Sequence, residues 1–111
     1  MFGGKLEKIQ KYAEKKDLKK LLAHAEDKDP EVRAAVAKGL GEIRSDDSCN
    51  ELITLLRDHD IAVQKEAVRA VGKIDMKAAT EHVHHVMDHT SDEELIGLCH
   101  KALAVLSHAK D

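Results

Sequence analysis

Apolar residues recur along the chain with the three- and four-residue spacing of amphipathic helices. In the stretch 29–43, Val32, Val36, Leu40 and Ile43 fall on one side of a helix that turns about 100° per residue. The segment 60–74 repeats this pattern 31 residues later, and a third copy begins at Asp92 with an offset of 32 residues. Three copies of one pattern predict a repeat protein.

Each copy carries the signals with which helices begin and end. Asp29, Asp60 and Asp92 open the three copies, where a carboxylate can accept hydrogen bonds from unpaired backbone N–H groups. Gly41 and Gly72 stand near the ends of the first two copies. They predict either a C-terminal stop or the close approach of a neighbouring helix.

A shorter apolar segment precedes each copy. These segments contain Leu18, Leu21 and Leu22, then Leu52, Ile53, Leu55 and Leu56, then Val83, Val86 and Met87. Only a few residues separate each short segment from the long one, so the paired helices are predicted to be antiparallel. A further helix over residues 5–15, with Leu6, Ile9 and Ala13 on one face, is expected to cap the stack.

The chain is therefore predicted to be all-α, an α-solenoid of antiparallel helix pairs with about three repeats and an N-terminal capping helix. The expected boundaries are 1–16 for the capping helix and 17–44, 45–75 and 76–111 for the units of the array. Leu56 from a short helix and Val71 from a long helix are expected in the core.

Composition supports an all-helical protein. Hydrophobic residues make up 42% of the 111 residues, charged residues 35% and aromatic residues 2%, and there is one proline. This excludes a disordered chain and makes a β-sandwich a poor fit. The chain has no apolar run long enough for a membrane span or a signal peptide, so a cytoplasmic location is expected. Cys49 and Cys99 are expected to be buried, reduced thiols.

Two strings of residues resemble HEAT repeats, specifically the short variety found in phycobilisome-lyase-like proteins. They are Asp-Pro-Glu-Val-Arg-Ala-Ala at 29–35, and Leu-Leu-Arg-Asp-His-Asp at 55–60 continuing through residues 63–72. The resemblance covers about residues 17–108. It implies a right-handed solenoid with the first helix of each pair on the convex side and the second on the concave side. The family hosts scaffolds, enzyme-associated subunits and nucleic-acid binders, and we expect a scaffold or adaptor that binds another protein through the concave face.

The resemblance also implies a role for Arg33, the family's arginine after the turn. In the later units, Gln64 and Ile96 stand at this position. If the arginine bonds to aspartates of the turns, the resulting ladder is expected to be incomplete in this chain.

A row of basic residues is predicted on the second helices. Lys38, Arg69 and Lys101 occupy equivalent sites in successive units, and Lys65 and Lys73 flank the row in the middle unit. The row is a candidate site for a protein partner with an acidic peptide segment, or for phosphate or nucleic acid. Nucleic acid is disfavoured because the net charge is −3 and no aromatic residues interleave the row. An ordinary solvated face is the plain alternative.

Histidines form the second candidate site. His82, His85 and His89 share a side of the third short helix, and three imidazoles are potential zinc or nickel ligands. Three ligands on one straight helix converge poorly on a single ion, so a solvent-facing histidine cluster is favoured over a metal site. No phosphate loop, nucleophile motif or paired-cysteine site appears, so neither an enzyme nor a cofactor is expected.

The last unit is unusually apolar for the end of a repeat array. Leu98 and Val105 stand where the second unit has Glu66 and Lys73. Terminal repeats normally present a polar outer face. Two explanations stay open: local burial of these side chains, or self-association through Leu98 and Val105, most simply as a homodimer.

Overall fold

The computed structural model describes residues 4–108, and the regular structure in this range is helical throughout. The elements are α1 (Gly4–Glu14), α2 (Leu18–Ala23), α3 (Pro30–Leu40), α4 (Asp46–Leu55), α5 (Ile61–Ile74), the 3-10 helix η1 (Lys77–Ala79), α6 (Thr80–Asp88) and α7 (Glu93–Leu106). Short and long helices alternate as predicted from the repeats.

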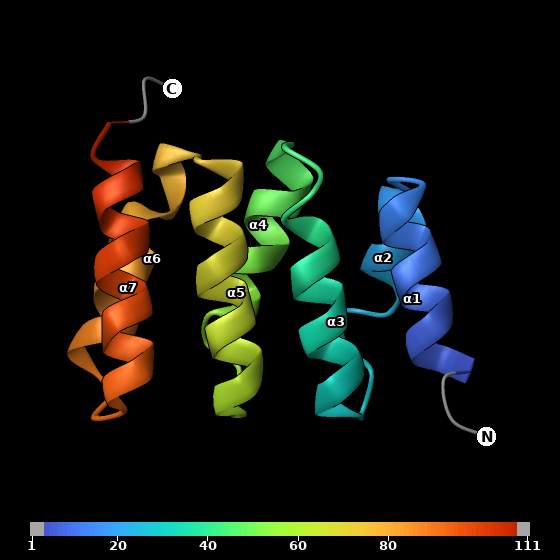
Figure 1. The fold of residues 1–111 in the computed structure, drawn as a ribbon, viewed down its shortest axis with the longest axis horizontal. Helices are drawn as coiled ribbons and strands as arrows, with labels where there is room; N and C mark the ends of the chain where they lie inside the picture. The colour runs from blue at the N-terminus through green and yellow to red at the C-terminus, as the bar shows by residue number, and fades with distance from the viewer. Residues whose placement is uncertain (1–3, 109–111) are drawn as a thin grey trace.

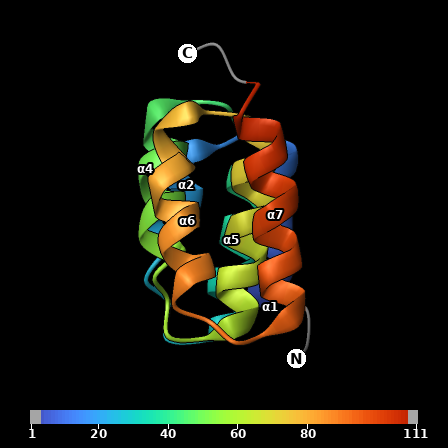
Figure 2. The same ribbon diagram turned by 90° about the vertical axis from the view of Figure 1, so that its left-hand side faces the viewer.

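The helices form two layers. Helices α1, α3, α5 and α7 lie side by side in one layer, and α2, α4 and α6 lie in the other (Figures 1 and 2). Contacts run between neighbours in the first layer, from α1 to α3, α3 to α5 and α5 to α7, and each short helix packs on the long helix that follows it. This is a short α-solenoid of antiparallel pairs. We call the outer surface of α1, α3, α5 and α7 the long-helix face.

The predicted aspartate caps are confirmed. Asp29, Asp60 and Asp92 each stand immediately before a long helix, and each carboxylate accepts a hydrogen bond from a backbone N–H of the first turn. Helix α4 begins with a serine cap instead of an aspartate. The cap is Ser45, whose hydroxyl accepts from the backbone N–H of Ser48 at 3.0 Å, while the Ser48 side chain is buried.

The hydrophobic core fills the space between the two layers. Leu56 and Val71 are both fully buried, as the repeat pattern predicted. The same is true of Leu21, Val83 and Leu106, which come from the first and last units. One continuous core therefore runs along the array, which is how repeats that are too small to fold alone stabilise one another.

Helix α1 lies at the N-terminal end of the stack, where the capping helix was expected (Figure 1). It packs beside α3 in the layer of the long helices, where it buries Ile9 (Figure 1). It thus takes the place that a second helix takes in the other pairs. The domain boundaries drawn from the sequence stay a prediction.

At Gly41 the structure shows a close approach of two helices, one of the two explanations that the sequence left open for this glycine. A Cβ at this position would lie 2.9 Å from Cβ and 3.0 Å from Cα of Ala70, so the glycine allows α3 to approach α5 closely. Gly72 lies inside α5, which ends in the left-handed residue Asp75. No helix in the described part of the chain is both long and apolar enough to cross a bilayer.

Candidate functional site on the long-helix face

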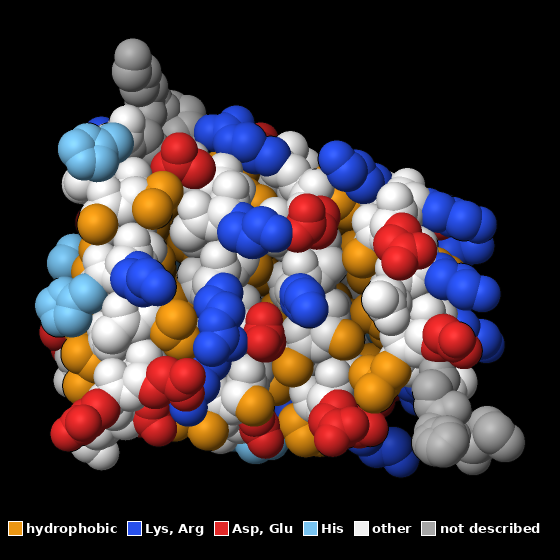
Figure 3. Space-filling model, viewed as in Figure 1, with side chains coloured by type: hydrophobic (Ala, Val, Ile, Leu, Met, Phe, Trp, Pro, Cys, Tyr) orange, Lys and Arg blue, Asp and Glu red, His pale blue; other side chains and the backbone are white. Residues whose placement is uncertain are grey.

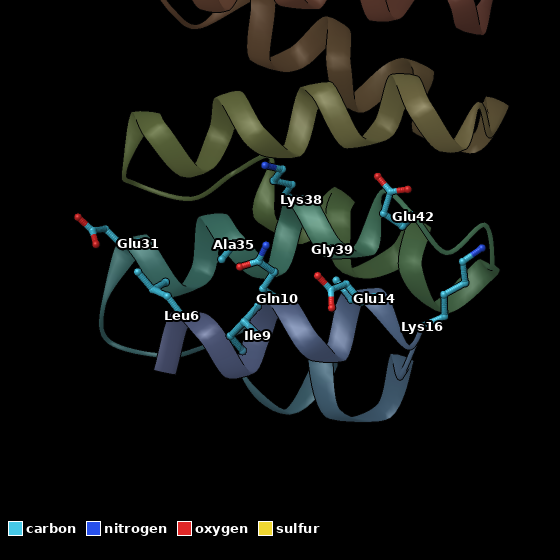
Figure 4. A pocket seen from close by; sticks show the side chains of 11 residues that line it. Leu6, Ile9, Gln10, Glu14, Lys16, Glu31, Ala35, Lys38, Gly39 and Glu42 are labelled. Carbon is cyan, nitrogen blue, oxygen red and sulfur yellow. The ribbon is translucent and has the colours of Figure 1, made fainter. Parts of the chain in front are cut away.

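A groove of about 600 Å³ runs between α1 and α3 on the long-helix face (Figure 4). Its floor is largely apolar, with Leu6, Ile9 and Ala13 from α1 and Ala35 from α3. The charged residues at its edge are Glu14, Lys16, Glu31, Lys38 and Glu42. Such a surface combines apolar area with charges of both signs, as protein-binding sites do.

Small residues shape this groove. Gly39 is buried, and a Cβ there would lie 3.0 Å from Cβ of Ala13 and 3.1 Å from Cδ2 of Leu21. Because Gly39 has no side chain, α1 and α2 can approach α3 closely at this point, and the small side chains of Ala13 and Ala35 line the groove beside it. The sequence predicted the apolar side of α1, while the groove itself follows from how α1 packs on α3.

The basic row is present but largely paired with acids. Lys65 of α5 contacts Glu94 at 2.6 Å and Asp92 at 3.6 Å. Arg69 contacts Glu66 at 3.0 Å and Glu94 at 3.7 Å. The hydrogen bond from Lys65, followed by its positive charge, lowers the pKa of Glu94. The pairs with Asp92 and Glu94 join α5 to the start of α7, whereas the Arg69–Glu66 pair lies within α5.

Lys73 is paired in the same way with Glu42, which follows α3. The long-helix face therefore alternates Lys and Arg with Asp and Glu side chains (Figure 3). Lys38 and Lys101 are exposed and form no ion pair with a carboxylate of the described residues. Only these two of the five predicted residues form no ion pair within residues 4–108, and Lys38 still acts on Glu42, whose pKa is lowered first by Lys73 and then by Lys16 and Lys38.

Arg33 lies away from this row and connects two turns. Its Nε and Nη2 donate to the Asp58 carboxylate at 2.8 and 3.0 Å, and its Nη1 donates to the carbonyls of residues 27 and 28. Burial by itself would raise the pKa of Asp58, but Arg33 and the backbone N–H of Asp60 outweigh it and lower that pKa. In the first unit Lys5 contacts Asp27 at 2.8 Å.

The second unit lacks this connection, as expected from the sequence. Gln64 replaces the arginine, and its amide donates to the Leu56 carbonyl at 3.0 Å rather than to the following turn. In the third unit Ile96 has no polar group to contribute. The arginine ladder is therefore incomplete, although Lys65, next to Gln64, contacts Asp92 of the following turn at 3.6 Å.

The histidines do not form the exposed flank that the sequence predicted. His82 and His85 are half-buried and His82 Nδ1 is buried without a hydrogen-bond partner, while His89 is exposed. The rings of His85 and His89 stack with centroids 4.1 Å apart. Among residues 4–108, no group of three His, Cys, Asp or Glu side chains is arranged to hold a metal ion.

The two cysteines lie in the core. Cys49 and Cys99 are buried on different helices, as predicted, and no disulfide joins them in the described chain. Burial raises the pKa of Cys99 to about 11, so its thiol is protonated at neutral pH and a poor nucleophile.

Leu98 and Val105 have different surroundings. They share the flank of α7 with Glu94, which reaches Lys65 and Arg69, so this flank faces α5 rather than the end of the stack. Leu98 is half-buried against the core, and Val105 is 41% exposed. Local burial thus accounts for Leu98, while self-association through the two residues stays a prediction that sedimentation over the micromolar range would test.

Comparison with known proteins places these observations in a family. No curated protein matches the chain. The sequence model of the HEAT repeats matches residues 18–104, from the start of α2 to near the end of α7. A match over this much of the chain, together with stacked antiparallel pairs and an arginine that connects two turns, shows that the chain belongs to the HEAT-repeat family.

Proposed function

We propose that the chain is a scaffold or adaptor that binds another protein through the long-helix face. HEAT repeats are commonly protein-interaction scaffolds. The observation that carries the proposal is the groove between α1 and α3, because its apolar floor includes Leu6, one of the few large hydrophobic side chains that are exposed. Apolar area of this kind favours burial by a partner.

Lys38 at the edge of the groove supports a partner segment with an acidic residue next to an apolar one. Lys38 lines the groove and forms no ion pair within residues 4–108, so an acidic side chain placed there would be attracted by its charge. An apolar neighbour in the segment would cover the exposed Leu6 side chain. The proposal includes the cytoplasmic location expected from the sequence.

Phosphate or nucleic acid along the basic row is the weaker candidate. Lys65, Arg69 and Lys73 are engaged with carboxylates, so a polyanion would compete with existing ion pairs. A salt series separates the two, because binding that rests on phosphate contacts falls steeply as salt increases.

Site-specific photo-crosslinking in native lysate tests the proposal. A benzophenone side chain replaces Ala35 or Lys38 in the groove, and Thr54 or His84 in the layer of short helices as control. We expect one discrete protein adduct from the groove positions only. Equal adducts from both layers, or adducts from the controls alone, would disprove the assignment.

A pair of charge reversals tests the role of Lys38. Lys38→Glu is expected to weaken the captured adduct roughly tenfold, since it replaces an attraction by a like-charge repulsion. Lys19→Glu makes the same charge change on exposed α2 and serves as the matched control. Equal losses for the two variants would show that net charge rather than the groove determines binding.

A further inference from the structure

A second pocket, of about 310 Å³, lies between the turn after α4, helix α5 and helix α6. Its polar lining consists of Arg57, Gln64, His85, His89 and Thr90. No aspartate or glutamate lines it. The pocket is thus surrounded by groups that can donate hydrogen bonds, two of which become cationic when they bind a proton.

Arg57 and the two histidines form one connected cluster. Nη1 of Arg57 lies 3.4 Å from Nε2 of His85, and the His85 and His89 rings are stacked at an interplanar angle of 23°. No carboxylate in the described range forms an ion pair with Arg57. The guanidinium therefore rests against a neutral imidazole, which compensates its charge poorly.

The hydrogen bonds indicate which ring nitrogens carry protons. His85 Nε2 accepts from Arg57, so the neutral ring bears its proton on Nδ1. His89 Nδ1 donates to the His85 carbonyl at 2.8 Å, so its Nε2 is the nitrogen that gains a proton when the ring becomes cationic. Burial, then Arg57 and His89, lowers the pKa of His85. The other titratable groups that act on His85 are His82 and Asp88, both from α6, while α5 contributes the uncharged Gln64.

We propose that this pocket binds a phosphate group, held by Arg57, His85 and His89. A guanidinium presents paired N–H donors that match the oxygens of a tetrahedral anion, and imidazolium groups add charge-assisted bonds. Thr90 adds a hydroxyl donor, because its oxygen already accepts from the backbone N–H of Asp92 at 3.1 Å. An anion would supply the negative charge that the cluster lacks.

The same geometry argues against a cation in this place. Stacked rings 4.1 Å apart direct their nitrogens alongside one another rather than toward a common point. Arg57 would repel a metal ion bound at His85. The histidines that the sequence marked as metal candidates are thus better suited to an anion.

Proton uptake should accompany binding. An anion next to these two imidazoles favours their charged forms, so it binds more tightly as the pH falls. Sulfate is the suitable probe because its charge stays constant across this range, whereas phosphate itself titrates.

The experiment is a sulfate titration at constant ionic strength, followed by the NMR signals of the histidine ring C–H groups. We expect the signals of His85 and His89 to shift in a saturable way, while those of exposed His84 and His100 do not. Affinity should be roughly fivefold higher near about pH 5.5 than near about pH 7.5. Equal shifts of all four signals, or none at His85 and His89, would overturn the proposal.

Two variants separate the pocket from general charge effects. Arg57→Met is expected to weaken sulfate binding roughly tenfold, because it removes a charge-assisted hydrogen bond. Lys19→Met removes the same charge from an exposed site on α2, outside the basic row, and should leave the affinity unchanged. Equal losses in the two variants would contradict a specific pocket.

A final comparison identifies the source of the phosphate group. Inorganic phosphate and a phosphoserine peptide are titrated into the same protein, with the unphosphorylated peptide as control. Tighter binding of the phosphopeptide indicates a phosphorylated protein segment, and equal binding indicates free phosphate. Failure of both at either pH would overturn the proposal, whatever the result of crosslinking in the α1–α3 groove.

Discussion

Arg33 connects consecutive units of the array through charge and geometry together. Its guanidinium binds both oxygens of Asp58 and two backbone carbonyls, and the two side chains are each only 9% exposed. A pair this well satisfied is costly to break, because the remaining charge is left with little water around it. Asp58 would lose its main compensation if Arg33 were absent.

We therefore expect Arg33→Met to lower the free energy of unfolding by about 2–4 kcal/mol. Arg69→Met is the matched control. The Arg69 side chain is 42% exposed and its ion pairs lie at the surface, so its loss should change stability by no more than about 0.5 kcal/mol. Urea unfolding monitored by circular dichroism measures both. Equal urea midpoints for the two variants would mean that the Arg33–Asp58 contact stabilises the fold no more than the exposed ion pairs of Arg69.

The same contact predicts how stability depends on pH. Because the pKa of Asp58 is lower in the folded chain than its ordinary value of 3.8, the unfolded chain takes up this proton first as the pH falls. The stabilisation is complete above the ordinary pKa and is lost as the pH falls below about 4. Arg33→Met should lose less stability than the wild type between about pH 5 and about pH 2. If the free energy of unfolding of the two proteins fell in parallel with pH, the Arg33–Asp58 contact would not be the source of the pH dependence.

At the scale of elements, the spacing between α3 and α5 depends on a single missing side chain. Gly41 ends α3 where the backbone of Ala70 in α5 comes within contact distance, whereas Gly72 faces Ala102 of α7 at 3.6 Å or more from a virtual Cβ. The first position has no room for a methyl group without backbone movement. The second has ordinary van der Waals space.

Gly41→Ala is expected to destabilise the protein by about 1–3 kcal/mol, since α3 and α5 must move apart. Gly72→Ala is the control at the equivalent repeat position. It should be neutral or stabilise by up to about 1 kcal/mol, because alanine favours the helix interior. Thermal unfolding of both variants tests the pair. A stable Gly41→Ala variant would show that the two helices adjust without cost.

At the scale of the whole molecule, one core holds the units together. Each long helix contacts its neighbours, and buried side chains follow one another from α1 to α7. Leu56 and Val71 lie in the middle unit and are fully buried. A cavity at either position therefore weakens the contacts of the middle pair with both neighbouring units.

We expect Leu56→Ala and Val71→Ala each to cost about 2–4 kcal/mol, with Leu56→Ala near the upper value because it removes more side chain. This is a large part of the stability of about 5–15 kcal/mol that is usual for a domain. Val105→Ala is the control for Val71→Ala: Val105 is 41% exposed, so its loss should stay within about 0.5 kcal/mol. Denaturation midpoints that match the wild type for both core variants would disprove the assigned helix faces.

The amino-acid sequence alone was enough for the architecture. The spacing of apolar residues placed the helices, Asp29, Asp60 and Asp92 marked their starts, and the repeat offset showed which helices pair. These features are local or periodic, because a helix is determined by its own turns and a repeat copies its contacts. For the same reason the sequence predicted the burial of Leu56 and Val71.

Only the tertiary structure decided which charged side chains are paired at the surface and where the pockets lie. It joined Arg33 to Asp58, paired Lys65, Arg69 and Lys73 with carboxylates, opened the groove beside α1 and set Arg57 against His85. Each of these contacts joins different turns or helices, and its geometry depends on how closely and at what rotation the helices pack. Periodicity within a helix carries no such information, so a row of positive residues in the sequence became a mixed surface in the folded chain.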